Sequence, residues 1–98
     1  MAYTIVWTPS AEEDLKEIVD YLYENWSLEI AEKFVDNTFK KVDLLKNTPY
    51  IGKTSQKLTF VRRILLSKHN GLFYRIMGNE VVILSILTLN QNPDNIPY

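Results

Sequence analysis

The 98-residue sequence contains no cysteine, only three glycines and four prolines, and a single histidine. Without cysteine, the chain can form neither a disulfide framework nor a thiolate metal site. No segment approaches the run of about 18 to 20 apolar residues that a membrane-spanning helix needs. The N-terminal MAYTIVWTPS also lacks the basic and apolar regions of a secretory signal. We therefore expect a cytoplasmic protein with no membrane segment.

The chain also has no strong excess of either positive or negative charge, because its formal net charge is only −1 at pH 7. The two halves nevertheless differ. Residues 1–48 carry five Lys/Arg and ten Asp/Glu, which is 5 − 10 = −5, and residues 49–98 carry six and two, which is 6 − 2 = +4. This asymmetry fits a polarised surface with an anionic partner on one side. It equally fits helices that carry solubilising glutamates, and composition does not separate the two interpretations.

With 46% apolar residues, a chain of this length is expected to form one domain over residues 1–98. The alternating AYTIVW predicts a first strand. Thr8 then caps a predicted helix that has Pro9 at its first position, and Ser27 caps a second one. The second helix should end before Pro49, because the residue ahead of a proline avoids the helical region. Together they predict a two-helix hairpin.

After the loop YIGKTSQKLT, which contains Lys53 and Lys57, the apolar period changes from helical spacing to two. Asn70-Gly71 and Gly78-Asn79 are both strong signals for two-residue hairpin turns. They predict a three-stranded antiparallel meander near residues 60–69, 72–77 and 80–89. The sequence therefore predicts an α+β fold with an N-terminal strand, a helical hairpin and a meander.

Two-residue turns at these positions would also assign the strand side chains to faces, because alternate residues point to opposite sides of a sheet. The more apolar face should pack under the helices; its members would be Val61, Arg63, Leu65, Ser67, Leu72, Tyr74, Ile76, Val81, Ile83 and Leu87. The other face should stay open; its members would be Phe60, Arg62, Ile64, Leu66, Lys68, Phe73, Arg75, Met77, Glu80, Val82 and Leu84. Arg62, Lys68 and Arg75 would then form a cationic row away from the helices.

No pattern for a phosphate-cradling loop, a zinc site or a Ser-His-Asp triad occurs, so we expect no metal and no cofactor. The acidic residues of AEEDLKE complement a helix dipole better than they suit acid–base pairing. The candidates for chemistry are therefore Arg62, Lys68, His69 and Arg75, of which His69 fits a solvated turn best. Tyr98 could line the edge of the open face, although no spacing requires it.

Four segments, in their order along the chain, resemble the ParE/RelE superfamily of bacterial type II toxins. WTPSAEEDLKEIVDYLYENWS resembles the first helix of ParE-type toxins, and AEKFVDNTFKKVDLLKNTPYIGK the second helix with its closing Pro-x-x-Gly. VRRILLSKHNGLFYRI resembles their Arg-Arg and Phe-Tyr-Arg strands, and EVVILSILTLNQNP their last strand and Asn-Pro tail. The resemblance spans almost the whole chain.

The resemblance implies one of two activities. RelE-like members cut messenger RNA in the ribosomal A site with a set of cations and a C-terminal tyrosine, whereas ParE-like members poison DNA gyrase. The positions of the RelE cations would correspond to Arg62, Ile64, Gly71 and about Gln91 of this chain. Of these four residues, only Arg62 is cationic. The long helices and the lack of a C-terminal helix are also ParE-like. The resemblance therefore favours a growth-inhibiting gyrase poison.

Two alternatives stay open. One is a ribosome-dependent endoribonuclease in which Lys68, His69 and Arg75 substitute for the missing cations. The other is a toxin fold with weakened activity, because Ser85 and Thr88 stand where ParE-like toxins usually carry Arg and His.

The resemblance also implies a cognate antitoxin and a hetero-oligomer with it. The antitoxin's disordered C-terminal segment would fold as it binds. Its expected contacts are Arg62, Arg75, Phe73, Met77, Val82 and Leu84.

Overall fold

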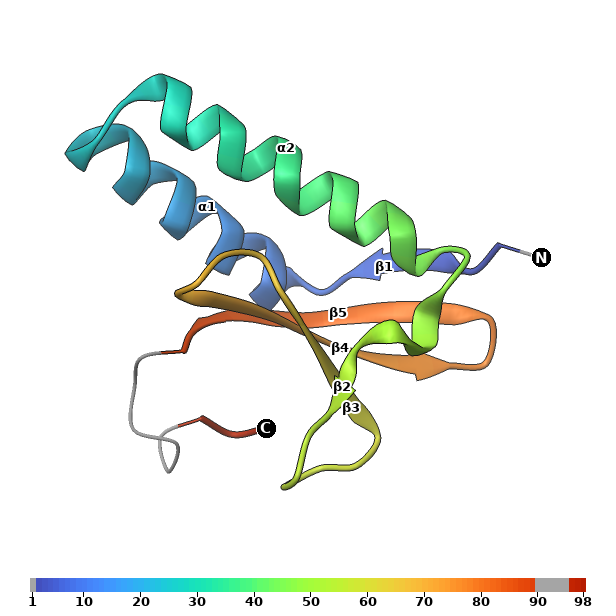
Figure 1. Cartoon of the computed structure of the whole chain (residues 1–98). Coiled ribbons are helices and arrows are strands. Elements are labelled where there is room, and N and C mark those ends of the chain that lie inside the picture. The colour runs from blue at the N-terminus through green and yellow to red at the C-terminus, as the bar shows by residue number, and fades with distance from the viewer. Residues whose placement is uncertain (1, 90–95) are drawn as a thin grey trace.

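The computed structural model describes residues 2–89 and 96–98, and it contains two long helices and a five-stranded sheet (Figure 1). The elements in chain order are β1 (Thr4–Trp7), α1 (Pro9–Asn25), α2 (Leu28–Leu45), the short 3-10 helix η1 (Pro49–Ile51), β2 (Lys53–Thr54), β3 (Val61–Leu65), β4 (Asn70–Met77) and β5 (Glu80–Thr88). The predicted α+β fold is confirmed. Strand β2 is an addition that its polar loop sequence did not predict.

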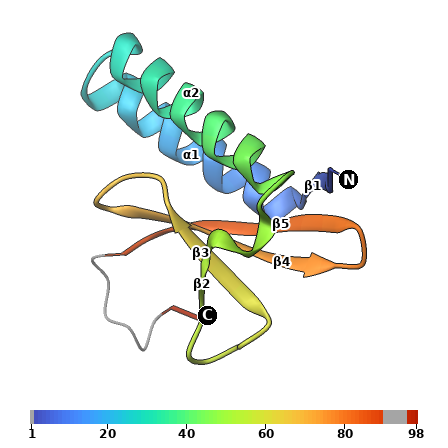
Figure 2. The same ribbon diagram turned by 45° about the vertical axis from the view of Figure 1, so that its right-hand side comes forward.

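The strands lie in the order β1-β5-β4-β3-β2, so the first strand of the chain pairs with the last. β1 runs parallel to β5, and all other pairs are antiparallel. Both helices cover the same side of the sheet, with α1 next to it and α2 farther out (Figures 1 and 2). Among the described helices, none combines the length and apolar character that crossing a membrane requires.

Both predicted helix caps are confirmed. The Thr8 hydroxyl accepts a hydrogen bond from the Ala11 N–H at 3.2 Å and donates to the Ile83 carbonyl at 2.8 Å. The Ser27 hydroxyl accepts from the Ile30 N–H at 3.1 Å. Such caps satisfy N–H groups that have no partner within the helix. Thr8 therefore both starts α1 and ties that start to β5.

The buried core lies between the helices and the sheet, and Tyr74 is its largest fully buried side chain. The Tyr74 hydroxyl donates to the Pro49 carbonyl at 2.7 Å and accepts from the Gly52 N–H at 3.0 Å. Burial raises the pKa of this hydroxyl above its ordinary value of 10.0, so it stays a donor at neutral pH. A Cβ atom at Gly52 would overlap the Tyr74 hydroxyl, so only glycine fits there.

The first hairpin turn does not lie at Asn70-Gly71, as the sequence predicts. Both residues belong to β4, neither has a positive φ, and Leu65 pairs with Gly71. The connection is instead closed by the Ser67 hydroxyl, which accepts from the N–H groups of His69 and Asn70 at 3.1 and 3.2 Å. A turn closed by the Ser67 side chain forms in place of the predicted Asn-Gly turn. Hydrogen bonding of a serine hydroxyl to nearby backbone N–H groups is the local preference that competes with the Asn-Gly signal.

The corrected turn changes the register of β3 against β4 by five residues, because Arg75 lies opposite Val61 and not opposite Leu66. Five is odd, so every β3 side chain exchanges faces. Arg62 lies opposite Tyr74 on the helix side, while Arg63 lies opposite Phe73 on the other side. The predicted grouping of Arg62 with Arg75 is therefore wrong. Leu66 is buried and belongs to the core cluster, contrary to its predicted place on the open face.

The second hairpin is confirmed, with Gly78 at a φ of 59° and Arg75 opposite Val82. A bulge then shifts the pairing, because Tyr74 lies opposite Ile83 but Phe73 lies opposite Ser85. The extra residue is Leu84. Beyond the bulge Ile86, not Leu87, faces the helices and is buried, so the predicted face of Leu87 is wrong as well.

We predict that Tyr74→Phe lowers the free energy of unfolding by about 1 to 3 kcal/mol, because it leaves the buried Pro49 carbonyl and Gly52 N–H without their partner. Urea unfolding followed by circular dichroism measures the change. The matched control is Tyr23→Phe, which removes an exposed hydroxyl and should change stability by less than about 0.5 kcal/mol. Equal stability of the two variants would contradict the role of the Tyr74 hydroxyl.

Candidate functional site

We call the sheet surface away from the helices the open face, and one row of residues crosses its centre. The backbone register places Lys53 of β2, Arg63 of β3, Phe73 of β4 and Ser85 of β5 side by side. Because directly paired residues point to the same side, two cations, an aromatic ring and a hydroxyl form this central row. Of its four members, the sequence placed only Phe73 on the open face.

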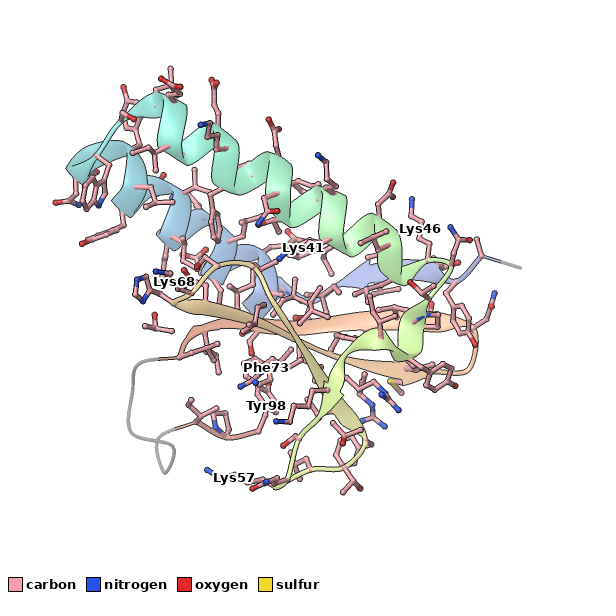
Figure 3. All side chains as sticks on the ribbon, in the orientation of Figure 1. Lys41, Lys46, Lys57, Lys68, Phe73 and Tyr98 are labelled. Carbon is pink, nitrogen blue, oxygen red and sulfur yellow. The ribbon has the colours of Figure 1, made fainter. Side chains whose placement is uncertain are left out.

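The C-terminal segment, residues 96–98, lies against this row. The ring of Tyr98 stacks on Phe73, with ring centres 5.0 Å apart and planes 28° apart. Figure 3 shows the two rings next to each other on the side of the sheet opposite the helices. The Lys57 ammonium donates to the Ile96 carbonyl at 2.6 Å. Tyr98, a candidate without a spacing argument, is thus placed at the centre of the open face.

A groove of about 300 Å³ opens beside this stack. It is lined by three cations, Lys53, Lys57 and Arg63, by the apolar side chains of Phe73, Leu89, Ile96 and Tyr98, and by Thr54, Ser55 and Gln56. None of these lining residues has a carboxylate side chain. Its size is at the lower end for small-molecule sites. The open-face groove therefore favours an anionic group accompanied by a flat or apolar one.

Two buried polar atoms on the open face have no hydrogen-bond partner among the described residues: Arg75 Nε and Ser85 Oγ. The Arg75 guanidinium lies 4.6 Å from the centre of the Phe60 ring, a cation–π contact that leaves its N–H donors available. Buried polar groups usually have a partner. Both atoms are therefore available to form a hydrogen bond with a ligand or a partner chain.

Arg62 lies on the other side of β3 and bonds to the chain itself. Its guanidinium donates to the carbonyls of Tyr50 and Gly52 at 3.1 and 2.8 Å and lies 5.1 Å from the centre of the Tyr50 ring. These contacts hold the η1 segment against the sheet from the same side as Tyr74. We therefore assign Arg62 a structural position on the helix side of β3. Arg63, which the sequence placed under the helices, lies on the open face where Arg62 was expected.

The other candidates are dispersed. Lys68 and His69 are exposed at the turn between β3 and β4, and Figure 3 shows Lys68 apart from Phe73 and Tyr98. Met77 is exposed on β4, whereas Val82 and Leu84 are half-buried on β5. Gln91 lies outside the described residues. Thr88 ends β5 opposite Asn70, not in the central row.

The sequence holds one signal that could have found the correct row. Ser67 precedes His69 and Asn70, and a serine hydroxyl can close a turn with residues two and three positions on. Placing the turn there gives the observed register and moves Arg63 beside Phe73.

A family model described as ParE toxin of type II toxin-antitoxin system, parDE, matches residues 5–93. Toxin ParE1 of Mycobacterium tuberculosis is 29% identical over 94 residues, which cover 96% of this chain and 95% of that protein.

Solved structures resemble the fold as well. A chain of the chromosomal ParDE toxin–antitoxin system of P. aeruginosa matches with a TM-score of 0.76 and 26% identity, covering 89% of this chain and 96% of the other. A chain of the toxin–antitoxin complex RelBE2 of M. tuberculosis matches with a TM-score of 0.60 and 24% identity, over 90% and 99%. The YoeB/ParE toxin of Agrobacterium tumefaciens matches with a TM-score of 0.64 and 15% identity, over 87% and 97%. The last two show the fold alone.

The neighbouring arginines of β3 give a direct test of the corrected faces. We predict that Arg62→Ala lowers the free energy of unfolding by about 1 to 3 kcal/mol, because it removes charged hydrogen bonds to the η1 backbone. Its matched control is Arg63→Ala, on the opposite face, which should leave that free energy within about 0.5 kcal/mol. Urea unfolding measures both variants. A larger loss in Arg63→Ala than in Arg62→Ala would reverse the face assignment.

Proposed function

Because the chain belongs to the ParE family of toxins from type II toxin–antitoxin systems, we propose that it inhibits growth by binding and poisoning DNA gyrase in the cytoplasm until a cognate antitoxin neutralises it. The observation that carries the proposal is the ParE match over residues 5–93. The two long helices α1 and α2, which this chain shares with ParE-like toxins, support gyrase over the ribosome.

The composition of the open face supports a protein target over free nucleic acid. Three cations line the open-face groove, and duplex affinity grows with the number of phosphates that a protein neutralises. Phe60, Leu65 and Met77 are exposed on or beside the same sheet. Apolar side chains rimmed by charge are typical of a protein interface.

The same face suits the antitoxin. An acidic and apolar segment could pair its carboxylates with Arg63 and Arg75 while its apolar side chains contact Phe73, Met77, Val82 and Leu84. The solved relatives include a ParDE system and a toxin–antitoxin complex, which supports a hetero-oligomer. Because the Tyr98 ring stacks on Phe73, the antitoxin displaces Tyr98 as it binds.

One observation favours ribosome-dependent cleavage of messenger RNA as the second candidate. Lys53, Lys57, Arg63 and Tyr98 meet in the open-face groove, and a set of cations with a C-terminal tyrosine is what RelE-like toxins use. Cations stabilise the charge that develops on a phosphate during cleavage. Proton transfer would fall to Tyr98 or a lysine, since the described lining holds no histidine or carboxylate side chain.

We predict that the purified protein inhibits gyrase supercoiling or accumulates gyrase-cleaved DNA, while ribosome-bound message in a translation extract stays intact. Arg63→Ala should weaken the gyrase effect at least tenfold, and Lys33→Ala, a cation of α2 outside the open face, should not. Message cut at codon boundaries, with the cuts lost in Arg63→Ala and Lys53→Ala, would replace gyrase by the ribosome as the target. Inactivity in both assays would favour the weakened toxin.

We predict that Arg75→Ala weakens the complex with the protein encoded by the neighbouring gene at least tenfold, because truncating one partner of a desolvated charge pair costs about 2 to 5 kcal/mol. Titration calorimetry measures the affinity, and circular dichroism verifies that the variant is folded. Lys33→Ala should bind as tightly as the unchanged protein. Unchanged affinity in Arg75→Ala, or tighter and salt-sensitive binding of the toxin to duplex DNA, would contradict an antitoxin on the open face.

A further inference from the structure

The first strand, β1, forms one edge of the sheet and has β5 as its neighbour on one side only. The Thr4 N–H donates to the Asn79 carbonyl at 3.0 Å, and the Thr8 N–H donates to a β5 carbonyl at 3.2 Å. The even-numbered residues of this segment therefore direct their backbone groups toward β5.

The odd-numbered residues of β1 direct their backbone groups the other way. The Tyr3 N–H, just before the strand, donates to the Lys46 carbonyl at the end of α2, at 2.8 Å. Because neighbouring residues of a strand in a parallel ladder bond to opposite sides, the N–H and C=O groups of Ile5 and Trp7 point to the free edge. Such an edge is a template for pairing with another strand.

A hollow of about 780 Å³ lies beside this edge, between β1 and α2, and we call it the β1 hollow. Ile5, Trp7 and Phe39 contribute to its apolar lining. The Trp7 and Phe39 rings lie 5.7 Å apart, and Phe39 is still 48% exposed. Uncovered apolar side chains therefore stand next to the free backbone groups of β1.

We propose that β1 is an interface between two copies of this chain, which join their β1 strands antiparallel about a two-fold axis at Val6. In this register Ile5 of each copy lies opposite Trp7 of the other, and each pair exchanges both of its hydrogen bonds. A register centred on Ile5 would place Trp7 opposite Tyr3, whose N–H already bonds to α2. A register centred on Trp7 would place Ile5 opposite Pro9, which has no N–H.

The side chains of β1 are self-complementary in this register. Ile5 and Trp7 pack against the core on the helix side, so Val6 points to the open side of the sheet. Across the interface, Ile5 of one copy contacts Trp7 of the other, and the two Val6 side chains meet at the axis. Pairs of an aromatic and a β-branched residue stabilise antiparallel strands. The sequence Ile-Val-Trp is thus its own partner.

The charge around the β1 hollow also suits a second copy. Lys40, Asp43 and Lys46 line it, so it carries both signs and selects no strongly acidic or strongly basic segment. A lipid surface is unsuitable, because free backbone N–H and C=O groups find no hydrogen-bond partner in hydrocarbon. A second β1 strand supplies these partners at the matching spacing.

The proposed dimer has a consequence for the open face. Directly paired residues point to the same side of a sheet, so the two-fold axis stands perpendicular to it. Both open faces therefore lie on one side of a continuous sheet, and both helical hairpins lie on the other. Two Phe73-centred rows facing the same way can bind a partner with two equivalent sites, which raises the overall affinity. The inference does not depend on which target the open face binds.

Sedimentation equilibrium of the full chain should show a reversible association of monomers into dimers as the concentration rises. Ile5→Pro should weaken the dimer at least tenfold, because proline removes the free N–H and cannot donate to a new strand. Its matched control is Thr54→Pro on β2, the opposite edge. There the Ser55 N–H bonds to Val61, so that of Thr54 points outward. This control should change the dimer affinity less than threefold, and circular dichroism verifies that both variants are folded.

A second pair of variants tests the axis at Val6 even where Ile5→Pro does not fold. Val6→Lys and Val6→Glu should each dimerise at least tenfold more weakly than the unchanged chain, because like charges directly opposite one another are destabilising. An equimolar mixture of the two should form a heterodimer at least tenfold tighter than either homodimer. A chain that stays monomeric, equal losses in Ile5→Pro and Thr54→Pro, or a mixture without a heterodimer would each overturn the proposal.

Discussion

The Tyr74 hydroxyl is the interaction on which the arrangement of the open face depends. It bridges the Pro49 carbonyl and the Gly52 N–H inside the core, and so it fixes the segment that carries the chain from the helices to the sheet. Lys53 follows at once and pairs with Arg63. A phenol buried on the helix side thereby determines which cations stand together on the opposite side.

The features that the sequence predicted correctly are those decided within a few residues. Thr8 and Ser27 cap their helices with side-chain oxygens, and Gly78 supplies the positive φ that its turn needs. The sequence predicts the wrong position for the turn between β3 and β4, because two local turn signals compete there. Ser67 closes the observed turn in place of Asn70-Gly71. Since side chains alternate along a strand, this single error exchanged the two faces of β3.

Other parts of the site depend on contacts between distant residues, and no local pattern encodes them. The bulge at Leu84 belongs to a strand whose Ile86 N–H donates to the Asp14 carboxylate of α1 at 3.1 Å. Tyr98 stacks on Phe73 although the two residues are far apart in the sequence. The charge imbalance between the halves is visible in the sequence, but the gathering of three cations in the open-face groove required the structure.

The parallel pairing of β1 with β5 has a consequence for the newly made chain. Thr8 bonds to Ile83 across 75 residues of sequence. The sheet can therefore be completed by β1 only after β5 is available to pair with it. Contacts of such long range slow folding, because the entropy of closing the loop is lost before they form, and during synthesis they need nearly the whole chain outside the ribosome. A prematurely terminated chain lacks both the partner of β1 and the tail over Phe73. The cell that makes this protein is thus exposed to a finished open face only when translation of the chain is all but complete.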